Sequence, residues 1–324
     1  MIITSAPLRI SFLGGGTDFP GWFQQHGGMV ISTTIDQYVH IIISHLSPVW
    51  GTKYKFSYSA IENVKSIEEI KHPLIRTCIK EFSNKDDRLS ILYASDLPGN
   101  SGLGSSSSFC AGMISGIKKL NQQPCLSKYE LARESIRIER NILEEAGGWQ
   151  DQVATSYGGF NKITFINKSF EVENLNDIFL SNYLKDCFLV HVGHLRKAHE
   201  ISIDQRNIML QKEKLYTEMT FLMEPALQAI EKNDYQEFSR LIDCSWELKK
   251  QYSQKITNSE VDDAVIKLKS LGGCGIKLLG AGSGGFLLCR FEDKNIAPKL
   301  KQLGFTYCLK VKGTKESITS KVLK

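Results

Sequence analysis

Apolar positions recur along the chain with two different periods, and the period distinguishes expected strands from expected helices. Residues 29–46 hold β-branched and aromatic residues in two runs interrupted near Asp36 and Gln37, a pattern typical of a hairpin. Residues 89–94 predict another strand by the same criterion. The first half of the chain is therefore expected to mix short strands with helices.

Helices are expected in the next segments. An apolar face with spacings of four, four and three predicts a helix over residues 109–120. Ser127, with Glu130 three residues later, forms a capping box and predicts a helix that ends near Glu145. A short helix should follow from Gln150 and end at glycines 158 and 159.

The second half of the chain predicts a domain of its own. A strand is expected at 187–192, and helices are expected over 197–271 with a break near Asn233. Strands at 275–279, 284–291 and 305–311 follow, with a helix at 295–303. Strands and helices in this arrangement indicate an α+β layer. We expect an N-terminal domain at 1–185 and a C-terminal domain at 186–324.

Composition and charge narrow the functional classes. The 324 residues are 42% hydrophobic and 23% charged, as in globular proteins, and the net charge of +5 is interspersed with acids. This distribution suits anionic small substrates and argues against a nucleic-acid partner. The chain shows no secretory leader and no apolar run of roughly 20 residues, so we expect a cytoplasmic protein without a membrane partner. Eight cysteines without a CxxC pair predict reduced thiols, and a structural metal site is not indicated.

A glycine- and serine-rich segment directly precedes the helix at 109–120. Glycines allow the backbone to approach a ligand, and amides at a helix N-terminus attract anions. Four serines exceed what capping needs, and their hydroxyls can bind phosphate oxygens or join a Mg²⁺ shell. A plain capped loop is the alternative. The segment predicts a triphosphate cradle without a Walker lysine, formed by Pro98, Gly99, Asn100, Ser101, Gly102, Leu103, Gly104, Ser105, Ser106 and Ser107.

Two further segments have candidate ligand-binding glycines. In the first, a strand delivers Arg9, which would remain charged beside a phosphoryl group, and a triple-glycine turn presents Thr17 and Asp18 to substrate hydroxyls. A tight turn with Asp18 as a local cap is the alternative. The second segment, 277–286, satisfies GxGxxG, but the strand-like FLLCRF follows it rather than a helix. A dinucleotide site is therefore disfavoured, and the turn is expected to approach a ligand held by the first domain.

Together the three segments resemble the motifs of the GHMP kinases, a family named for galactokinase, homoserine kinase, mevalonate kinase and phosphomevalonate kinase. The resemblance extends over residues 6–19, 98–108 and 277–286, in the family's order. Within the family, residues 6–20 and 147–152 look most like bacterial D-glycero-D-manno-heptose 7-phosphate kinases and related sugar 1-kinases. The resemblance implies an N-terminal domain like ribosomal protein S5 domain 2, a ferredoxin-like C-terminal domain, and an active site between them.

The resemblance also implies residue roles. Residues 98–108 would wrap the phosphates of ATP, Ser106 and Glu139 would bind Mg²⁺, and Asp151 would be the general base close to Arg9. Glu139 lies twelve residues before Asp151, which matches the family's separation. The alternative for Glu139 is a solvated charge on a helix surface, and the alternative for Asp151 is a helix N-cap alone. Substrate contacts are expected from Gly15, Gly16, Thr17, Asp18, Gly282 and Ser283.

The expected acceptor is a sugar phosphate. His194 and Arg196, at the end of a strand that enters a helix, form a candidate clamp for its phosphate, with a basic surface helix start as the alternative. The hypothesis is transfer of phosphate from ATP to the anomeric hydroxyl of heptose 7-phosphate, for nucleotide-heptose and surface polysaccharide synthesis. A kinase for a free sugar such as fucose, a sugar- and ATP-sensing regulator and an ATP-dependent decarboxylase stay open. The oligomeric state is open as well, with a homodimer among the options.

Overall fold

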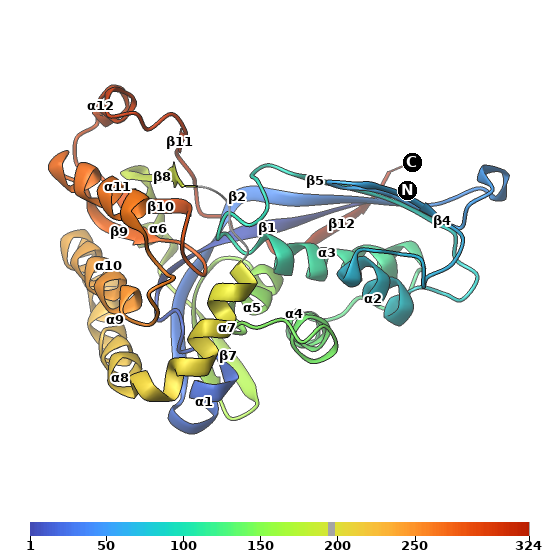
Figure 1. The fold of residues 1–324 in the computed structure, drawn as a ribbon, viewed down its shortest axis with the longest axis horizontal. Helices are drawn as coiled ribbons and strands as arrows, with labels where there is room; N and C mark the ends of the chain where they lie inside the picture. The colour runs from blue at the N-terminus through green and yellow to red at the C-terminus, as the bar shows by residue number, and fades with distance from the viewer. Residues whose placement is uncertain (194–197, 324) are drawn as a thin grey trace.

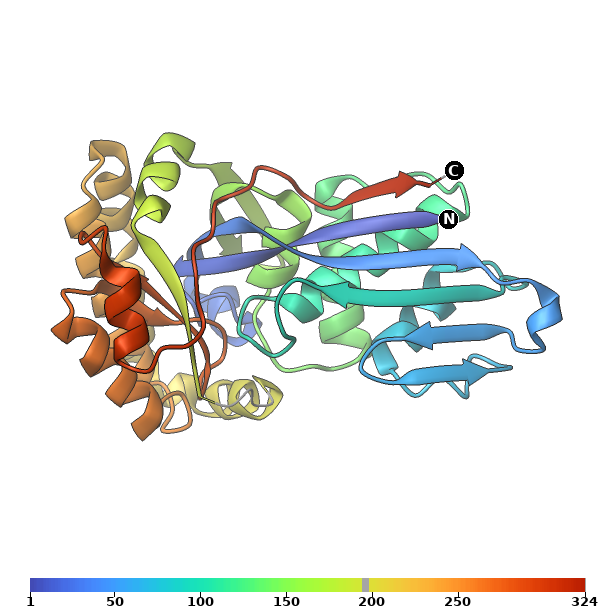
Figure 2. The same ribbon diagram turned by 90° about the horizontal axis from the view of Figure 1, so that it is seen from above.

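The computed structural model describes residues 1–193 and 198–323, and two β-sheets organise these residues (Figure 1). The larger sheet has eight strands, and the smaller one has four. Helices cover one face of the larger sheet and the outer face of the smaller one (Figures 1 and 2). The expected α+β fold with two domains is confirmed.

The larger sheet is built on two long strands, and its order is β12-β1-β2-β5-β3-β4, with β6 and β7 extending from β2. The helices α2–α5 lie along one face (Figure 2). The strands are β1 (Ile2–Leu13), β2 (Gly28–His45), β3 (Tyr54–Ser57), β4 (Ile61–Val64), β5 (Leu89–Ser95), β6 (Phe160–Ile166), β7 (Ser169–Asn174) and β12 (Thr319–Val322). The helices of this half are α1 (Pro20–His26), α2 (Pro73–Phe82), α3 (Ser105–Leu120), α4 (Lys128–Ile136), which continues as a π-helix (Arg137–Ile142), and α5 (Gln150–Tyr157), with a 3₁₀ turn at Pro48–Trp50.

The hairpin predicted within residues 29–46 is wrong, because β2 is one continuous strand. Its first half pairs with β6 and its second half pairs with β5. The polar break at Asp36 falls where the partner changes. There the Asp36 carboxylate accepts a hydrogen bond from the Lys312 amide (2.8 Å), and the Asp36 amide donates to the Lys312 carbonyl (2.9 Å).

The predicted helix at 109–120 begins earlier than expected. In the structure α3 starts at Ser105, and its N-cap, Gly104, has a left-handed φ of 77°. Several of the serines predicted as loop therefore form the first turn of the helix. The capping box of Ser127 and Glu130 is present as predicted.

The smaller sheet has the order β11-β8-β10-β9 and is antiparallel throughout. Its strands are β8 (Cys187–Val192), β9 (Cys274–Leu278), β10 (Gly285–Arg290) and β11 (Cys308–Leu309). The helices of this half are α6 (Asp177–Lys185), α7 (Ala198–Ile208), a 3₁₀ turn (Met209–Lys212), α8 (Glu213–Phe221), α9 (Met223–Lys232), α10 (Tyr235–Lys250), α11 (Ser259–Ser270) and α12 (Ile296–Gln302). The predicted break near Asn233 is confirmed, since this residue ends α9 with a φ of 55°. The strand predicted over 305–311 is reduced to two residues.

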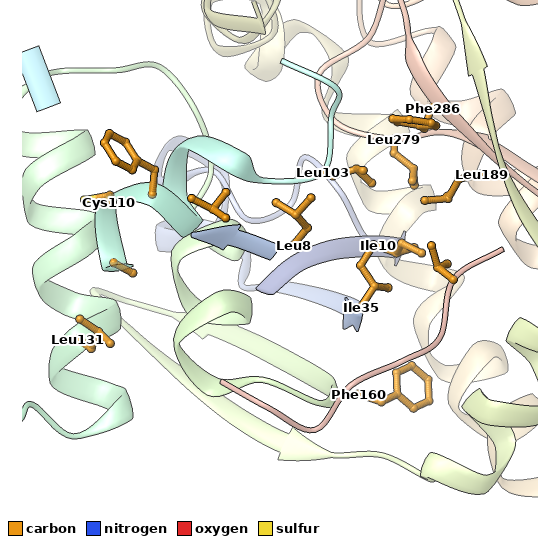
Figure 3. Packing of buried hydrophobic residues seen from close by; sticks show 14 of the residues in the cluster. Leu8, Ile10, Ile35, Leu103, Cys110, Leu131, Phe160, Leu189, Leu279 and Phe286 are labelled. Atoms are coloured by element: carbon orange, nitrogen blue, oxygen red, sulfur yellow. The ribbon is translucent and has the colours of Figure 1, made fainter. Parts of the chain in front are cut away.

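The predicted division at residue 185 requires a correction at the C-terminal end. The chain returns to the first domain, where β12 pairs with β1 in the register Ile2–Val322. The two domains also share one hydrophobic core, in which Phe12 of β1 contacts Tyr183 of α6 and Phe238 of α10 edge-on. Figure 3 shows part of this core, including Leu8 from the first domain and Leu279 from the second.

Candidate active site

A cleft of about 560 Å³ lies between the two domains. The first domain contributes the glycine turn after β1, the loop before α3 and the starts of α3 and α5, and the second contributes residues of α7, α10 and β9 and the turn after β9. The cleft brings together predicted residues of the first two motifs with Glu139 and Asp151. The volume lies within the range of about 300–1,000 Å³ usual for small-molecule sites.

The loop before α3 forms one wall of the cleft. Gly102 has a φ of +83°, and a Cβ on it would lie 2.3 Å from the carbonyl oxygen of Leu279. Only glycine permits this approach of the two glycine-rich segments. Leu103 is fully buried in the shared core (Figure 3), and its carbonyl accepts a hydrogen bond from the Arg9 amide at 2.9 Å. The loop is thereby fixed to both domains.

The predicted phosphate-binding residues divide into two groups. Pro98 and Gly99 are exposed outside the cleft, and Ser101 and Leu103 are buried behind it. The residues that line the cleft are Asn100, Gly102, Gly104, Ser105, Ser106 and Ser107. The amides of the first turn of α3 have no partner within the helix, so this wall can bind an anion.

Glu139 is buried in the cleft wall with a side-chain network around its carboxylate. The hydroxyls of Ser106 and Ser107 donate to its two oxygens at 3.0 and 2.7 Å, and the Gln152 amide donates to Oε2. Only 1% of Glu139 is exposed, so it is not a solvated helix charge. Hydroxyl and carboxylate oxygens are the hard donors that Mg²⁺ prefers, and the residues present fit this ion. Gln152 belongs to this network although its sequence context did not indicate it.

Arg9 and Asp151 form a bidentate ion pair in the cleft. Arg9 Nε and Nη2 donate to the two carboxylate oxygens of Asp151 at 2.8 and 2.7 Å. Arg9 Nη1 donates to the carbonyl oxygen of Gly102 at 2.6 Å, which joins the pair to the phosphate-binding loop. The N-cap of α5 is Trp149, so Asp151 is not an N-cap and its carboxylate is directed to Arg9. Fork-to-fork pairs of this kind fix both partners in orientation.

Asp18 is held in the cleft by backbone amides. Its oxygens accept hydrogen bonds from Gly16 N at 2.9 Å and from Gln150 N at 3.2 Å, so it is also the local cap that was the alternative. Burial, and then the charge of Asp151, raise the pKa of the Asp18 carboxyl. A Cβ on Gly148 would lie 1.8 Å from Asp18 Oδ2, which makes glycine necessary at this position.

The remaining predicted substrate contacts have different locations. Gly15 and Gly16 line the cleft beside Asp18. Thr17 does not line it, because its hydroxyl is buried and donates to the carbonyl oxygens of Gly14 and Met29. Gly282 and Ser283 also lie outside the lining; the Ser283 hydroxyl donates to the Lys255 carbonyl. His194 and Arg196 lie outside the residues that the structure describes.

Two buried lysines and an aromatic pair complete the site without having been predicted. Lys249 and Lys277 line the cleft with exposures of 7% and 2%. The rings of Tyr216 and Tyr252 stack at 4.1 Å and close the space behind Gly16, where a Cβ would lie 2.8 Å from Tyr252. Lys277 is the first residue of the segment 277–286 and lies in a buried strand three residues before Gly280, a signal that could have identified it. Lys249 gave no such signal, since it stands next to Lys250 at the C-terminal end of a helix, where lysines usually face solvent.

Clusters of metal-binding side chains and helices long and apolar enough to cross a membrane are both absent among the described residues. Within residues 1–193 and 198–323, no group of three or more His, Cys, Asp or Glu side chains could hold a metal ion. A cation at Glu139 would therefore rely on ligand phosphates and water for its remaining donors. Among the same residues, no helix has the length and apolar character that crossing a bilayer requires. All eight cysteines have free thiols, as expected.

Comparisons with known proteins agree with this geometry. A family model described as GHMP kinases N terminal domain matches residues 73–159, and one described as GHMP kinases C terminal matches residues 226–302. A D-glycero-alpha-D-manno-heptose 7-phosphate kinase of Campylobacter jejuni is 28% identical over 302 residues, which is 88% of each chain.

Two further relatives differ in coverage. An L-fucokinase/L-fucose-1-P guanylyltransferase of Bacteroides fragilis is 24% identical over 92% of this chain and 35% of its own length. The crystal structure of a D-glycero-D-manno-heptose 1-phosphate kinase from Bacteroides thetaiotaomicron matches 100% of both chains with a TM-score of 0.74 and 21% identity. This structural likeness shows that the two proteins have the same two-domain fold.

Proposed function

The chain belongs to the GHMP kinases, and from this premise we propose that it transfers the γ-phosphate of ATP to the anomeric hydroxyl of D-glycero-D-manno-heptose 7-phosphate. It is an ATP-dependent phosphotransferase whose acceptor is a hydroxyl group of a sugar. The product would be the heptose 1,7-bisphosphate, a precursor for nucleotide-heptose and surface polysaccharide synthesis. The similarity to a heptose 7-phosphate kinase over 88% of the chain supports this acceptor.

The observation that carries the proposal is the position of the Arg9–Asp151 pair. It lies between the phosphate-binding loop, through the Arg9–Gly102 hydrogen bond, and the turn that holds Asp18. The anomeric oxygen attacks the γ-phosphorus, the bond to the bridging oxygen of ADP breaks, and the hydroxyl proton passes to Asp151. Arg9 remains charged through this step and stabilises the transferring group. Orientation by the ion pair is expected to contribute as much as proton removal.

Nucleotide and metal would occupy the wall formed by the loop and α3. Gly104 caps α3 with a left-handed φ of 77°, and the first turn of α3 supplies amides for the phosphates. Ser106 and Glu139 would hold Mg²⁺, with Ser107 and Gln152 orienting the carboxylate. When bound, Mg²⁺ neutralises charge on the phosphate oxygens.

The sugar would lie against the glycine turn. Asp18 would accept hydrogen bonds from sugar hydroxyls while its backbone partners fix its position. Gly15 leaves room for a sugar, because a Cβ on it would have no atom closer than 3.9 Å, the distance to the side chains of Gln150 and Ser11. His194 and Arg196 are proposed from the sequence alone as contacts to the 7-phosphate.

A free-sugar 1-kinase is the second candidate function. It is favoured by the similarity to the fucokinase of Bacteroides fragilis, although this relative is much longer than the chain. A catalytically weak regulator is less consistent with the complete set of Arg9, Asp151 and Glu139 in one cleft.

The test is ADP release from MgATP against a panel of free and phosphorylated hexoses and heptoses. The proposal expects strong turnover with heptose 7-phosphate and at least tenfold lower kcat/KM with the unphosphorylated sugars. Turnover confined to fucose or another free sugar would replace the proposed acceptor by the second candidate. No turnover across the panel, with ATP still bound, would overturn the proposed activity on these sugars.

A further inference from the structure

Two lysine side chains that have no place in the mechanism above are buried in the cleft. Lys249, from the C-terminal turn of α10, donates to the carbonyl oxygen of Gly280. Lys277, from β9, donates to the carbonyl oxygen of Phe12 at 2.8 Å. These are the hydrogen bonds found for the two ammonium groups among the described residues, although each group has three donors. A buried ammonium with unused donors is costly unless an anion completes it.

The charges around the cleft give these two amines no carboxylate partner among the described residues. Arg9 is paired with Asp151, and Arg140 lies 3.8 Å from the carboxylate of Glu145. Across the described part of the chain, no carboxylate oxygen lies within 4.0 Å of either lysine nitrogen. Asp18 is the remaining nearby acid, and its oxygens accept hydrogen bonds from backbone amides. Positive charge is therefore in excess at this end of the cleft.

The positions of the amines indicate where an anion would bind. Gly280, which accepts from Lys249, packs on Gly102 so closely that a Cβ would lie 2.3 Å from the Gly102 Cα. Lys249 therefore adjoins the phosphate-binding loop. A Cβ on Gly15 would lie 4.0 Å from Lys277 Nζ, so Lys277 adjoins the glycine turn on the sugar side. The two amines lie near the junction of the nucleotide and sugar walls.

We propose that Lys249 and Lys277 form a two-amine binding site for a phosphate group at this junction. This inference rests on the proposed function. The phosphate is either the terminal group of the nucleotide or the phosphate of the sugar, since both present the same dianionic oxygens. Burial, together with nearby positive charges, lowers the pKa of both lysines, and a bound phosphate would restore their protonated forms.

The test compares Lys249→Met and Lys277→Met with Lys250→Met in the full-length protein. Lys250 is the matched control, because it follows Lys249 in α10 but forms an ion pair with Glu247 at 2.7 Å outside the cleft. Dissociation constants are measured by calorimetry for ADP, the non-hydrolysable analogue AMPPNP, heptose and heptose 7-phosphate. Met has nearly the length of Lys and removes the charge. If a Met variant does not fold, the corresponding Lys249→Gln or Lys277→Gln variant is used instead, because Gln also removes the charge but keeps a hydrogen-bond donor.

Two results would support the site and identify its source of phosphate. Loss of at least tenfold in AMPPNP affinity, with ADP affinity within twofold of wild type, assigns the amines to the terminal phosphate of the nucleotide. The same loss for heptose 7-phosphate, with heptose and AMPPNP unchanged, assigns them to the phosphate of the sugar.

The inference is overturned if both variants bind all ligands within twofold of wild type. It is also overturned if Lys250→Met causes the same losses. A wild-type protein that phosphorylates no sugar would remove the proposed function, but the comparison of ADP with AMPPNP would still decide on the amines. Conversely, normal turnover of heptose 7-phosphate in both variants would leave the function standing and remove the site.

Discussion

Replacing Asp151 with asparagine tests whether the Arg9–Asp151 pair performs the chemistry. Asparagine has the same shape, keeps one oxygen as an acceptor for Arg9, and loses the negative charge. Its amide nitrogen would face a guanidinium N–H that now donates to Oδ2 at 2.7 Å. One of two charge-assisted hydrogen bonds is therefore lost, and the variant has no carboxylate to accept the hydroxyl proton.

The expected magnitudes differ for stability and for catalysis. A hydrogen bond to a charged group contributes about 1.5–3 kcal/mol, and the 24% exposure of the Asp151 side chain lowers this to about 1–2 kcal/mol in the free energy of unfolding. General-base catalysis usually contributes about 10²–10⁴-fold. Because phosphoryl transfer depends mainly on positioning, we expect kcat to fall at least tenfold. Affinity for ATP should stay within twofold, since the Asp151 carboxylate accepts from Arg9, and it is Arg9 that contacts the phosphate-binding loop at Gly102.

Steady-state kinetics and calorimetric ATP binding measure both effects. Asp177→Asn is the control, because Asp177 is also an acid in the first turn of a helix and pairs with a basic residue, Lys315, at 2.7 Å, but lies away from the cleft. Wild-type kcat in Asp151→Asn would refute the assignment of the base. A tenfold loss of ATP affinity with unchanged kcat would refute the location of the residue beside the acceptor.

Three more changes test other parts of the site. Gly148→Ala places a Cβ 1.8 Å from Asp18 Oδ2, so the KM for the sugar should rise at least tenfold. The control is Gly21→Ala, whose Cβ would make an ordinary contact, and this variant should leave the KM unchanged. Glu139→Gln removes the charge expected to hold Mg²⁺, and the Mg²⁺ concentration for half-maximal activity should rise at least tenfold; an unchanged requirement would remove Glu139 from the metal site. Burial lowers the pKa of Lys249 from 10.5 to about 8. Between these pH values the folded protein therefore binds fewer protons than the unfolded chain, and stability rises with pH. The free-energy cost of the buried charge thus decreases as pH rises from about 8 to 10.5. Lys249→Met should therefore stabilise the protein at pH 7, by up to about 3 kcal/mol in urea unfolding, with a smaller gain at pH 9.5, and an equal gain at both pH values would contradict this account.

The parts of the fold that follow local patterns were predictable. The capping box at Ser127 and the break at Asn233 depend on nearby residues, and the structure has both. The break expected at Asp36 is absent because the Lys312 backbone, 276 residues later, satisfies the polar side chain inside a strand. Strand β12 has the sequence TSKV, with little apolar pattern, and only its pairing with β1 makes it a strand.

The site shows the same limit. The resemblance to the GHMP kinases implied Arg9, Glu139 and Asp151, and the structure brings all three to one cleft. Spacing could not indicate that Gln152 donates to Glu139, because that contact depends on how α5 packs against the π-helical segment. Lys249 was unpredictable for a related reason: its neighbour Lys250 has the same side chain and a surface ion pair, and only tertiary packing distinguishes the two.

The origin of each side chain suggests a division of tasks between the domains. Arg9, Glu139 and Asp151 all come from the first domain, and their hydrogen bonds reach Gly102, Ser106, Ser107 and Gln152 of that same domain. The geometry of phosphoryl transfer is therefore set within one packed unit. The second domain contributes Ser202, Gln205, Lys249 and Lys277 to the lining of the cleft. Of these, Lys277 adjoins the glycine turn, and Lys249 adjoins the loop before α3 through Gly280. Under the proposed function, changes in α7 or β9 are therefore expected to alter which acceptor binds while the Arg9–Asp151 pair keeps its geometry.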